Sequence, residues 1–296
     1  MRIRRYGRAI LAAIVASTLA WSAALMISRG QAATVDLTRN DGSRLDLKGY
    51  ALTFDESFKD LSISARGGGG SRWIAHTPWN GDFGEAAFAD PGPDGPFSLS
   101  PDGLVITASR GPDGRWRSGL IASRDKDGPD GRGFAQKYGY FEMRAKLPGG
   151  KGVWPAFWLI GADKSKQSSE IDVLEYYGHF PTYYHSVAHL WTLDGKDVLN
   201  LQQKFVVPSQ NLETQFNDYG VLIEPERTSF YLNRRRTWEI PTPEAYKQPM
   251  YLLANLALGG GWPVELDGPV KLQIKHIRAY QRKSQLAPPP NRQPRR

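Results

Sequence analysis

SEIDVLEYYG, residues 169–178, is the most informative stretch of this chain. Ile171 and Val173 are β-branched, which favours a strand. Successive side chains of a strand point to opposite faces, so Glu170 and Asp172 share one face. Glu175 has the wrong parity for that face, and one β-bulge at Val173–Leu174 would restore it. We therefore predict a bulged strand that lines three carboxylates along one surface.

Three acids on one strand repel one another, and glycoside hydrolysis is a chemistry that can use this arrangement. A retaining mechanism needs a carboxylate nucleophile and a carboxylic acid about 5–5.5 Å apart. Four regular strand steps span roughly 13 Å, a gap that two long Glu side chains leaning together could close. The central Asp can share a proton with a neighbour and separate the ionisation states of the pair. The alternative is a solvated polar face on an edge strand.

Upstream, the stretch WPAFW (residues 154–158) carries two tryptophans. Pro155 disfavours a helix interior, and in a strand Trp154 and Trp158 share a face. The flat C–H faces of sugar rings stack on indole, so two tryptophans on one wall suit a glycan. The alternative for each of them is core packing.

The remaining body of the chain indicates an all-β domain. Its apolar residues alternate or run for five to ten positions between turn signals, without a convincing helical period, which is typical of a sandwich or jelly roll. The strands expected from this pattern lie at 104–108, 138–147, 219–223, 228–232, 250–258 and 272–280.

Composition narrows the function classes. The 296 residues include 34 aromatics and no Cys, which excludes a largely disordered chain, disulfides and Cys-ligated metals. Five basic residues precede position 33 and five follow position 281 without an acid among them, so the formal charge of +8 becomes −2 for the body. Nucleic-acid binding rests on that charge alone, and we predict no nucleic-acid partner.

The two ends are predicted to lie outside the domain. Residues 1–32 have early arginines, an apolar stretch and a small-x-small cleavage pattern, which indicates a signal peptide and a secreted or periplasmic protein. An uncleaved membrane anchor is the alternative. Residues 282–296 are predicted to be a disordered, basic, Pro-rich tail, and residues 33–281 a single domain.

Six stretches of the sequence together resemble glycoside hydrolase family 16, the laminarinase and β-glucanase group. In chain order they are YGYFEMRAKLP (138–148), WPAFWLI (154–160), SEIDVLEYYG (169–178), HSVAHLW (185–191), NDYGVLIEPERTSFYLN (217–233) and NLALGGGWP (255–263). The E-x-D-x-x-E spacing is similar to the bulged form of laminarinase-like members. The resemblance implies a β-jelly-roll sandwich of the concanavalin A type with a concave substrate cleft.

The resemblance also implies roles for individual residues. Glu170 corresponds to the nucleophile, Glu175 to the general acid/base and Asp172 to the assisting acid. The residues that match substrate-contacting positions of the family are Glu142, Arg144, Trp154, Trp158, His189, Asn255 and Trp262. For Glu142 and Arg144 a surface ion pair is the alternative.

Two departures from the family are visible. Arg234-Arg235-Arg236 stands where many members have a short Asp-Gly turn, and we predict a basic hairpin tip that could contact an acidic polymer. Many members bind a structural calcium, but nothing in this sequence identifies such a site, so no metal and no cofactor is predicted.

The sequence therefore predicts a secreted, monomeric, retaining endo-β-glycanase whose partner is a polysaccharide. The substrate is expected to be β-1,3- or mixed β-1,3/1,4-glucan, or a bacterial exopolysaccharide. The alternative is a non-catalytic glycan-binding jelly roll, which would keep the tryptophans and could lose any one of the acids.

Overall fold

The computed structural model describes residues 33–38, 42–79, 81–125, 132–207 and 211–286. The chain divides into two units, Met1–Ala33 and Thr34–Arg296. The predicted signal peptide, residues 1–32, lies outside the described residues. Within them, no helix is both long and apolar enough to cross a membrane.

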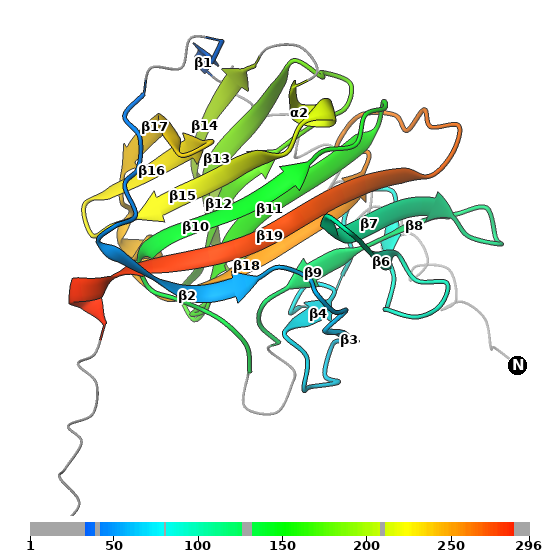
Figure 1. Ribbon diagram of the computed structural model, residues 1–296, viewed down its shortest axis with the longest axis horizontal. Coiled ribbons are helices and arrows are strands. Elements are labelled where there is room, and N and C mark those ends of the chain that lie inside the picture. The colour runs from blue at the N-terminus through cyan, green and yellow to red at the C-terminus, as the bar shows by residue number, and fades with distance from the viewer. Residues whose placement is uncertain (1–32, 39–41, 80, 126–131, 208–210, 287–296) are drawn as a thin grey trace, which may run out of the picture. The chain divides into compact units, whose positions relative to one another are not determined.

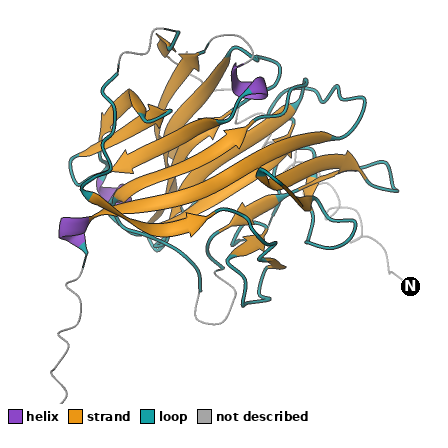
Figure 2. Cartoon of the chain, in the orientation of Figure 1, coloured by secondary structure: helices purple, strands orange, loops and turns teal. Residues whose placement is uncertain are grey.

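The regular secondary structure of the described residues is almost entirely strand, with a few short helices (Figures 1 and 2). The described residues form two mixed sheets. In spatial order the first sheet contains β1 (Ala33–Asp36), β14 (Asp197–Val206), β13 (Tyr183–Thr192), β12 (Gln167–Glu175), β11 (Val153–Gly161), β18 (Met250–Leu258), β9 (Leu120–Ala122), β4 (Trp73–Ala75) and β3 (Ile63–Ala65).

The second sheet lies in front of the first in Figure 1. In spatial order it contains β17 (Arg235–Pro241), β16 (Arg227–Leu232), β15 (Asn217–Ile223), β10 (Gly139–Lys146), β19 (Val270–Arg282), β7 (Gly103–Arg110), β8 (Trp116–Ser118) and β5 (Ala87–Phe88), with β2 (Tyr50–Glu56) beside β19 and β6 (Phe97–Ser100) beside β7. The short helices of the described chain are α2 (Asn211–Thr214), η2 (Glu244–Tyr246) and η3 (Lys283–Gln285).

The main core lies between the two sheets. Alternation sends Phe157 and Leu159 of β11 and Ile171 of β12 into one cluster with Phe141 and Met143 of β10. All five are buried to within 1 % of full burial. Each sheet therefore has one face committed to the core, and the opposite face is where polar side chains can gather. The predicted jelly-roll sandwich is confirmed.

The predicted bulge is confirmed. The register of β12 shifts between Asp172 and Glu175 in its pairing with β13 and again in its pairing with β11. Leu174 faces Phe157 while Asp172 faces Trp158, so Val173 is the extra residue. Glu175 consequently returns to the face that holds Glu170 and Asp172.

The C-terminal boundary lies a little later than predicted. Strand β19 runs to Arg282, and η3 continues to Gln285. Arg282 donates from Nε to Glu224 Oε1 at 3.0 Å, which ties the first residues of the predicted tail to the sheet. Residues 287–296 lie outside the described residues.

Candidate active site

The three acids of β12 lie on the outer face of the first sheet, which we call the acid face. The registers of the sheet place its residues in three rows across the strands. Along β18, β11, β12, β13 and β14 these rows are Tyr251–Ile160–Glu170–His189–Asn200, Leu253–Trp158–Asp172–Val187–Gln202 and Asn255–Ala156–Glu175–His185–Lys204. Each acid therefore stands at the centre of its own row, with an apolar or aromatic neighbour on the β11 side.

Glu170 is partly exposed and has one oxygen held in place. The indole Nε1 of Trp191 donates to its Oε2 at 2.7 Å, which leaves Oε1 without that constraint. Burial raises the pKa of Glu170, and the positive charge of His189 and the Trp191 hydrogen bond oppose the rise. A carboxylate with one free oxygen is suited to attack an electrophilic carbon.

Asp172 is buried between the two glutamates. It is 5 % exposed, and burial raises its pKa well above the ordinary value, with the charges of Glu170 and Glu175 adding to the rise. An Asp in this setting keeps its proton while an adjacent carboxyl group is ionised, so Asp172 and Glu170 do not both carry a charge.

An imidazole links Asp172 to Asp197, a partly exposed acid of β14. His189 Nε2 lies 3.4 Å from Asp172 Oδ2, and His189 Nδ1 lies 2.7 Å from Asp197 Oδ2. Burial favours neutral His189, but the hydrogen bond to Asp197 and the charge of Glu170 outweigh it and raise the pKa of His189. Asn200 also donates to Asp197 Oδ2, at 2.8 Å. The ring is therefore fixed with Nε2 toward the acids of β12.

Glu175 also has one oxygen occupied. Its Oε1 accepts hydrogen bonds from Trp154 Nε1 at 3.1 Å and from the Tyr177 hydroxyl at 3.0 Å. The rings of Trp154 and Tyr177 stack with their centroids 5.8 Å apart. Oε2 is left as the oxygen that can exchange a proton with a bound molecule.

The structure brings Trp154, Trp158 and His189 to the acid face and changes the role predicted for Asn255. Asn255 has no exposed surface, and its Oδ1 accepts a hydrogen bond from Trp158 Nε1 at 2.8 Å. Because it is fully buried, Asn255 cannot touch a polymer directly, and it orients Trp158 instead. Trp262 is partly exposed and packs edge-on against Phe180, with centroids 4.9 Å apart.

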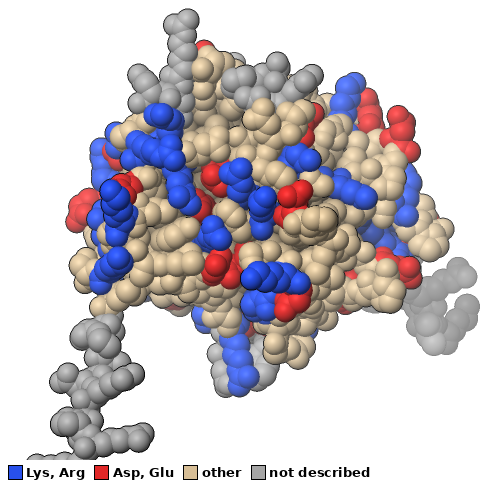
Figure 3. All heavy atoms as spheres, in the orientation of Figure 1, with Lys and Arg blue, Asp and Glu red and all other residues tan. Residues whose placement is uncertain are grey.

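The assignment of Glu142 and Arg144 to the same cleft is wrong. Both lie on β10, and β10 belongs to the second sheet between β15 and β19. Phe141 and Met143 fill the core, so alternation turns Glu142 and Arg144 to the far side of the molecule from the acid face. Figure 3 shows basic and acidic side chains interspersed over that side.

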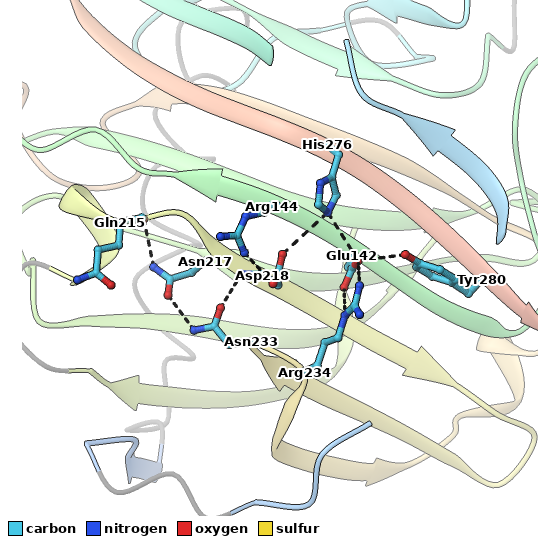
Figure 4. A network of polar contacts seen from close by, with 9 residues as sticks. All are labelled: Glu142, Arg144, Gln215, Asn217, Asp218, Asn233, Arg234, His276 and Tyr280. Atoms are coloured by element: carbon cyan, nitrogen blue, oxygen red, sulfur yellow. Dashed lines mark hydrogen bonds and ion pairs between the residues drawn. The ribbon is translucent and has the colours of Figure 1, made fainter. Parts of the chain in front are cut away.

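Glu142 and its neighbours form a separate set of contacts, the convex network of Glu142, Arg144, Asp218, Arg234 and His276 (Figure 4). Arg234 donates to both oxygens of Glu142, at 2.9 and 2.6 Å, and Arg144 donates to Asp218 at 2.9 Å. Burial alone would raise the pKa of Glu142, but the nearby His276, whose Nε2 lies 3.6 Å from Oε1, and the two hydrogen bonds from Arg234 lower it to about 2.

The convex network also contains the ligand types of a metal site. Carboxylate or imidazole atoms of Glu142, Asp218 and His276 lie within 4.8 Å of one another. Both carboxylates already pair with arginines, and a cation would have to displace them. We therefore assign no metal to this network.

Sequence reasoning missed three residues of the acid face: Trp191, Tyr177 and Asp197. Trp191 could have been predicted, because it lies two residues after His189 and alternation places both on the same face of the strand. Tyr177 lies beyond the end of β12, where alternation no longer applies. Asp197 comes from the next strand, and its position depends on a register that one sequence does not specify.

Solved structures with this fold agree with the architecture. The laminarinase catalytic domain from Thermotoga maritima superposes with a TM-score of 0.61 at 21% identity, covering 79% of this chain and 99% of that domain. The laminarinase from Rhodothermus marinus gives 0.61 at 24%, covering 78% and 97%. The chain thus has the jelly-roll sandwich fold of these two structures.

Sequence comparison gives the family. The profile of glycosyl hydrolases family 16 matches residues 122–274, just over half of the chain. The chain belongs to glycosyl hydrolases family 16.

Two relatives in Rhizobium meliloti are similar to it. The endo-1,3-1,4-beta-glycanase EglC is 32% identical over 199 residues, covering 62% of this chain and 39% of EglC. The endo-1,3-1,4-beta-glycanase ExsH is 30% identical over 260 residues, covering 80% and 53%. The chain thus spans about half or less of these relatives.

Proposed function

We propose that this protein is a secreted, endo-acting, retaining β-glycanase that cleaves β-1,3- or mixed β-1,3/1,4-linked glucan or a bacterial exopolysaccharide. The observation that carries the proposal is the bulged strand β12, which presents Glu170, buried Asp172 and Glu175 on one face. We further propose that the acid face is the substrate cleft and that the protein acts as a monomer.

In the proposed reaction Glu170 is the nucleophile. Its free Oε1 attacks the anomeric carbon while protonated Glu175 donates from Oε2 to the leaving glycosidic oxygen. The carbon–oxygen bond to the leaving sugar breaks as the bond to Glu170 forms. The Trp191 N–H stays on Oε2 of Glu170 and fixes the direction of attack.

Glu175 is then a carboxylate, and it takes a proton from water that attacks the same carbon from the opposite side. The second inversion restores the original anomeric configuration and frees Glu170. Asp172 and His189 do not bond to the sugar in this scheme. They hold one proton close to Glu170 and so control the charge that it carries before and after attack.

The names of the relatives support the substrate class. EglC and ExsH are both named endo-1,3-1,4-beta-glycanases, and a Rhodothermus marinus relative, 29% identical over 165 residues, is named a beta-glucanase. Because the chain spans only part of the first two, activity and substrate are proposed for this chain on the strength of its own acids.

The stereochemistry tests the mechanism. Early-time proton NMR of the products should show the β-anomer of the new reducing end first, followed by slow mutarotation. An initial α-anomer would exclude a double displacement and leave an inverting reaction.

A polymer panel tests the substrate and the alternative function. Reducing-end release is measured on laminarin, barley β-glucan, a succinoglycan-type polymer and agarose. Release of reducing ends from laminarin, barley β-glucan or the succinoglycan-type polymer supports the proposal. Retention of the protein on a polymer without any release would instead indicate a non-catalytic glycan-binding jelly roll.

The proposed export rests on residues 1–32 and is tested by fractionation. Mature protein that starts near residue 33 in the medium or periplasm supports it, and full-length protein in the membrane fraction would indicate an anchor.

A further inference from the structure

The third row of the acid face ends in a cation. Glu175 of β12 pairs with His185 of β13, and His185 pairs with Lys204 of β14. Residues directly opposite one another point to the same face, so Lys204 stands on the face of the acids. Two strand spacings of about 4.8 Å place its backbone about 10 Å from that of Glu175.

Lys204 has no ion-pair partner among the residues that the structure describes. Its ammonium lies 5.0 Å from the ring centroid of Tyr183, and its side chain is partly exposed. Two residues before Lys204 on β14, Gln202 is hydrogen bonded to His185 Nδ1 at 2.9 Å. A positive charge is therefore presented at the edge of the acid face without a carboxylate to neutralise it.

Aromatic rings lead from Glu175 to this lysine. Tyr177 contacts His185, which contacts Tyr183 in turn, with centroids 6.0 and 5.4 Å apart. Tyr183 stacks on Phe180 at 5.2 Å, and Phe180 meets Trp262 at 4.9 Å. A glycan leaving the Glu175 oxygens in this direction would pass the rings of Tyr177, His185 and Tyr183 before it reaches the ammonium.

We infer that Lys204 binds an acidic substituent of the glycan, beyond the two sugar rings joined by the scissile bond. The inference rests on the proposed function and gives it a substrate class: a β-glycan that carries carboxylate groups rather than a neutral one. A lysine ammonium is a compact point charge with three donors, which suits a substituent whose position varies from one repeat to the next.

The test uses two polymers with one backbone, laminarin and partially carboxymethylated laminarin. Binding is measured by affinity electrophoresis, and every protein in that assay carries Glu170→Gln so that the polymer is not cleaved. The value of kcat/KM is measured for the same proteins without Glu170→Gln. Lys204→Met should lower the preference for the carboxymethylated polymer about tenfold, which corresponds to about 1.4 kcal/mol. Lys204→Arg, which keeps the charge, should retain most of the preference.

Lys271→Met is the matched control, because Lys271 is an exposed lysine on β19 of the other sheet. It should leave the ratio between the two polymers unchanged. The preference of the unaltered protein should also decrease as NaCl rises from about 20 to about 300 mM, because salt screens an exposed charge.

Two outcomes separate the inference from the proposed function. If Lys204→Met leaves the ratio unchanged, or weakens both polymers equally, Lys204 does not bind the substituent and the inference is overturned. If neither polymer is cleaved but Lys204→Met still weakens binding of the charged polymer alone, the proposed glycanase activity fails and the inference stands.

Discussion

The acid face and the convex network both collect carboxylates on an outer sheet face, but they treat them in opposite ways. Glu142 of the convex network is fully buried, and two hydrogen bonds from Arg234 compensate its charge. Asp172 of the acid face is almost as buried, and the carboxylates beside it oppose its ionisation. One site has lowered a carboxyl pKa and the other has raised one.

The difference supports the proposal that the acid face carries the chemistry and that the convex network stabilises the fold. A fully compensated carboxylate keeps its charge over a wide pH range, and its oxygens are already occupied by protein donors and so cannot bind a ligand. An uncompensated carboxyl group keeps its proton to a higher pH than usual, and its burial costs the fold free energy, which is typical of reactive sites. Residue type alone does not separate them, because both clusters combine carboxylates with a histidine.

The largest expected contrast is in activity. Glu170→Gln should lower kcat by about 10³-fold or more, because the amide cannot act as the nucleophile. Glu142→Gln should keep kcat within about threefold, since Glu142 lies on the other sheet. Rates on the most active polymer of the panel decide this, with circular dichroism as the check on folding. A Glu170→Gln protein with near-normal turnover would remove β12 from the mechanism.

The next contrast is in stability. Arg234→Met should lower the free energy of unfolding by about 3–5 kcal/mol, because it leaves the Glu142 charge buried without its partner. Arg235→Met, at the next position of the same hairpin tip, should change it by less than about 0.5 kcal/mol. Urea unfolding at neutral pH measures both.

A double variant distinguishes the loss of charge compensation from the loss of packing by the Arg234 side chain. Arg234→Met combined with Glu142→Met should recover most of the lost stability, because no uncompensated charge remains. Additive losses in the double variant would show that Arg234 stabilises through packing instead of charge.

The pH dependence of stability should differ in sign between the two clusters. The folded pKa of Glu142 is about 2, below its ordinary value, so its contribution of about 3 kcal/mol is present above pH 4.5 and lost as pH falls toward 2. In the Glu142→Gln variant, the free energy of unfolding should therefore fall less steeply as the pH decreases over this range. The raised pKa of Asp172 works the other way, because its favourable contribution is present below its ordinary pKa and lost as pH rises.

Asp172→Asn should therefore stabilise the protein at neutral pH, by about 1 kcal/mol, while it lowers activity. Unfolding curves at pH 3 and pH 7 provide the comparison, and the gain should be absent at pH 3, below the ordinary Asp pKa of 3.8. A variant that is less stable than the parent at pH 7 would contradict the raised pKa.

The smallest effect concerns His189. Asp197→Asn removes the carboxylate at Nδ1, so the pKa of His189 should fall. The stability that protonated His189 contributes is present at low pH and lost as pH rises through its folded pKa, and the variant should lose it at a lower pH. NMR titration of the imidazole measures the shift, and an unchanged midpoint would show that Asp197 does not hold the proton.

The alternation of apolar and polar residues was enough to predict the sandwich. The odd spacing from Asp172 to Glu175 was enough to predict the bulge and the shared face of the three acids. These features depend on local geometry, which a strand of known period determines. The error at Glu142 and Arg144 has the same origin. Alternation separates the two faces of a strand, but it does not say which sheet the strand joins. Strand β10 pairs with β15 and β19, more than 70 residues later in the chain.

The basic hairpin tip shows a similar limit of local reasoning. Asn233 and Arg234 have φ values of 52° and 61°, and this left-handed turn directs Arg234 back to Glu142. The sequence predicted a basic hairpin tip at Arg234, Arg235 and Arg236 that could contact an acidic polymer. The structure makes one of them the partner of a buried acid, and only the other two remain at the surface to meet a polymer.

The Val173 bulge has a consequence for insertions and deletions. Its carbonyl accepts a hydrogen bond from the buried Ser186 hydroxyl at 2.7 Å, so the extra residue is anchored from the neighbouring strand. Deleting Val173 or Leu174 would shorten the step from Asp172 to Glu175 and still leave both on one face. Deleting Ile171 would turn Glu170 and Asp172 to opposite faces. The bulge is thus the position in β12 where the chain can lose one residue and keep all its acids together.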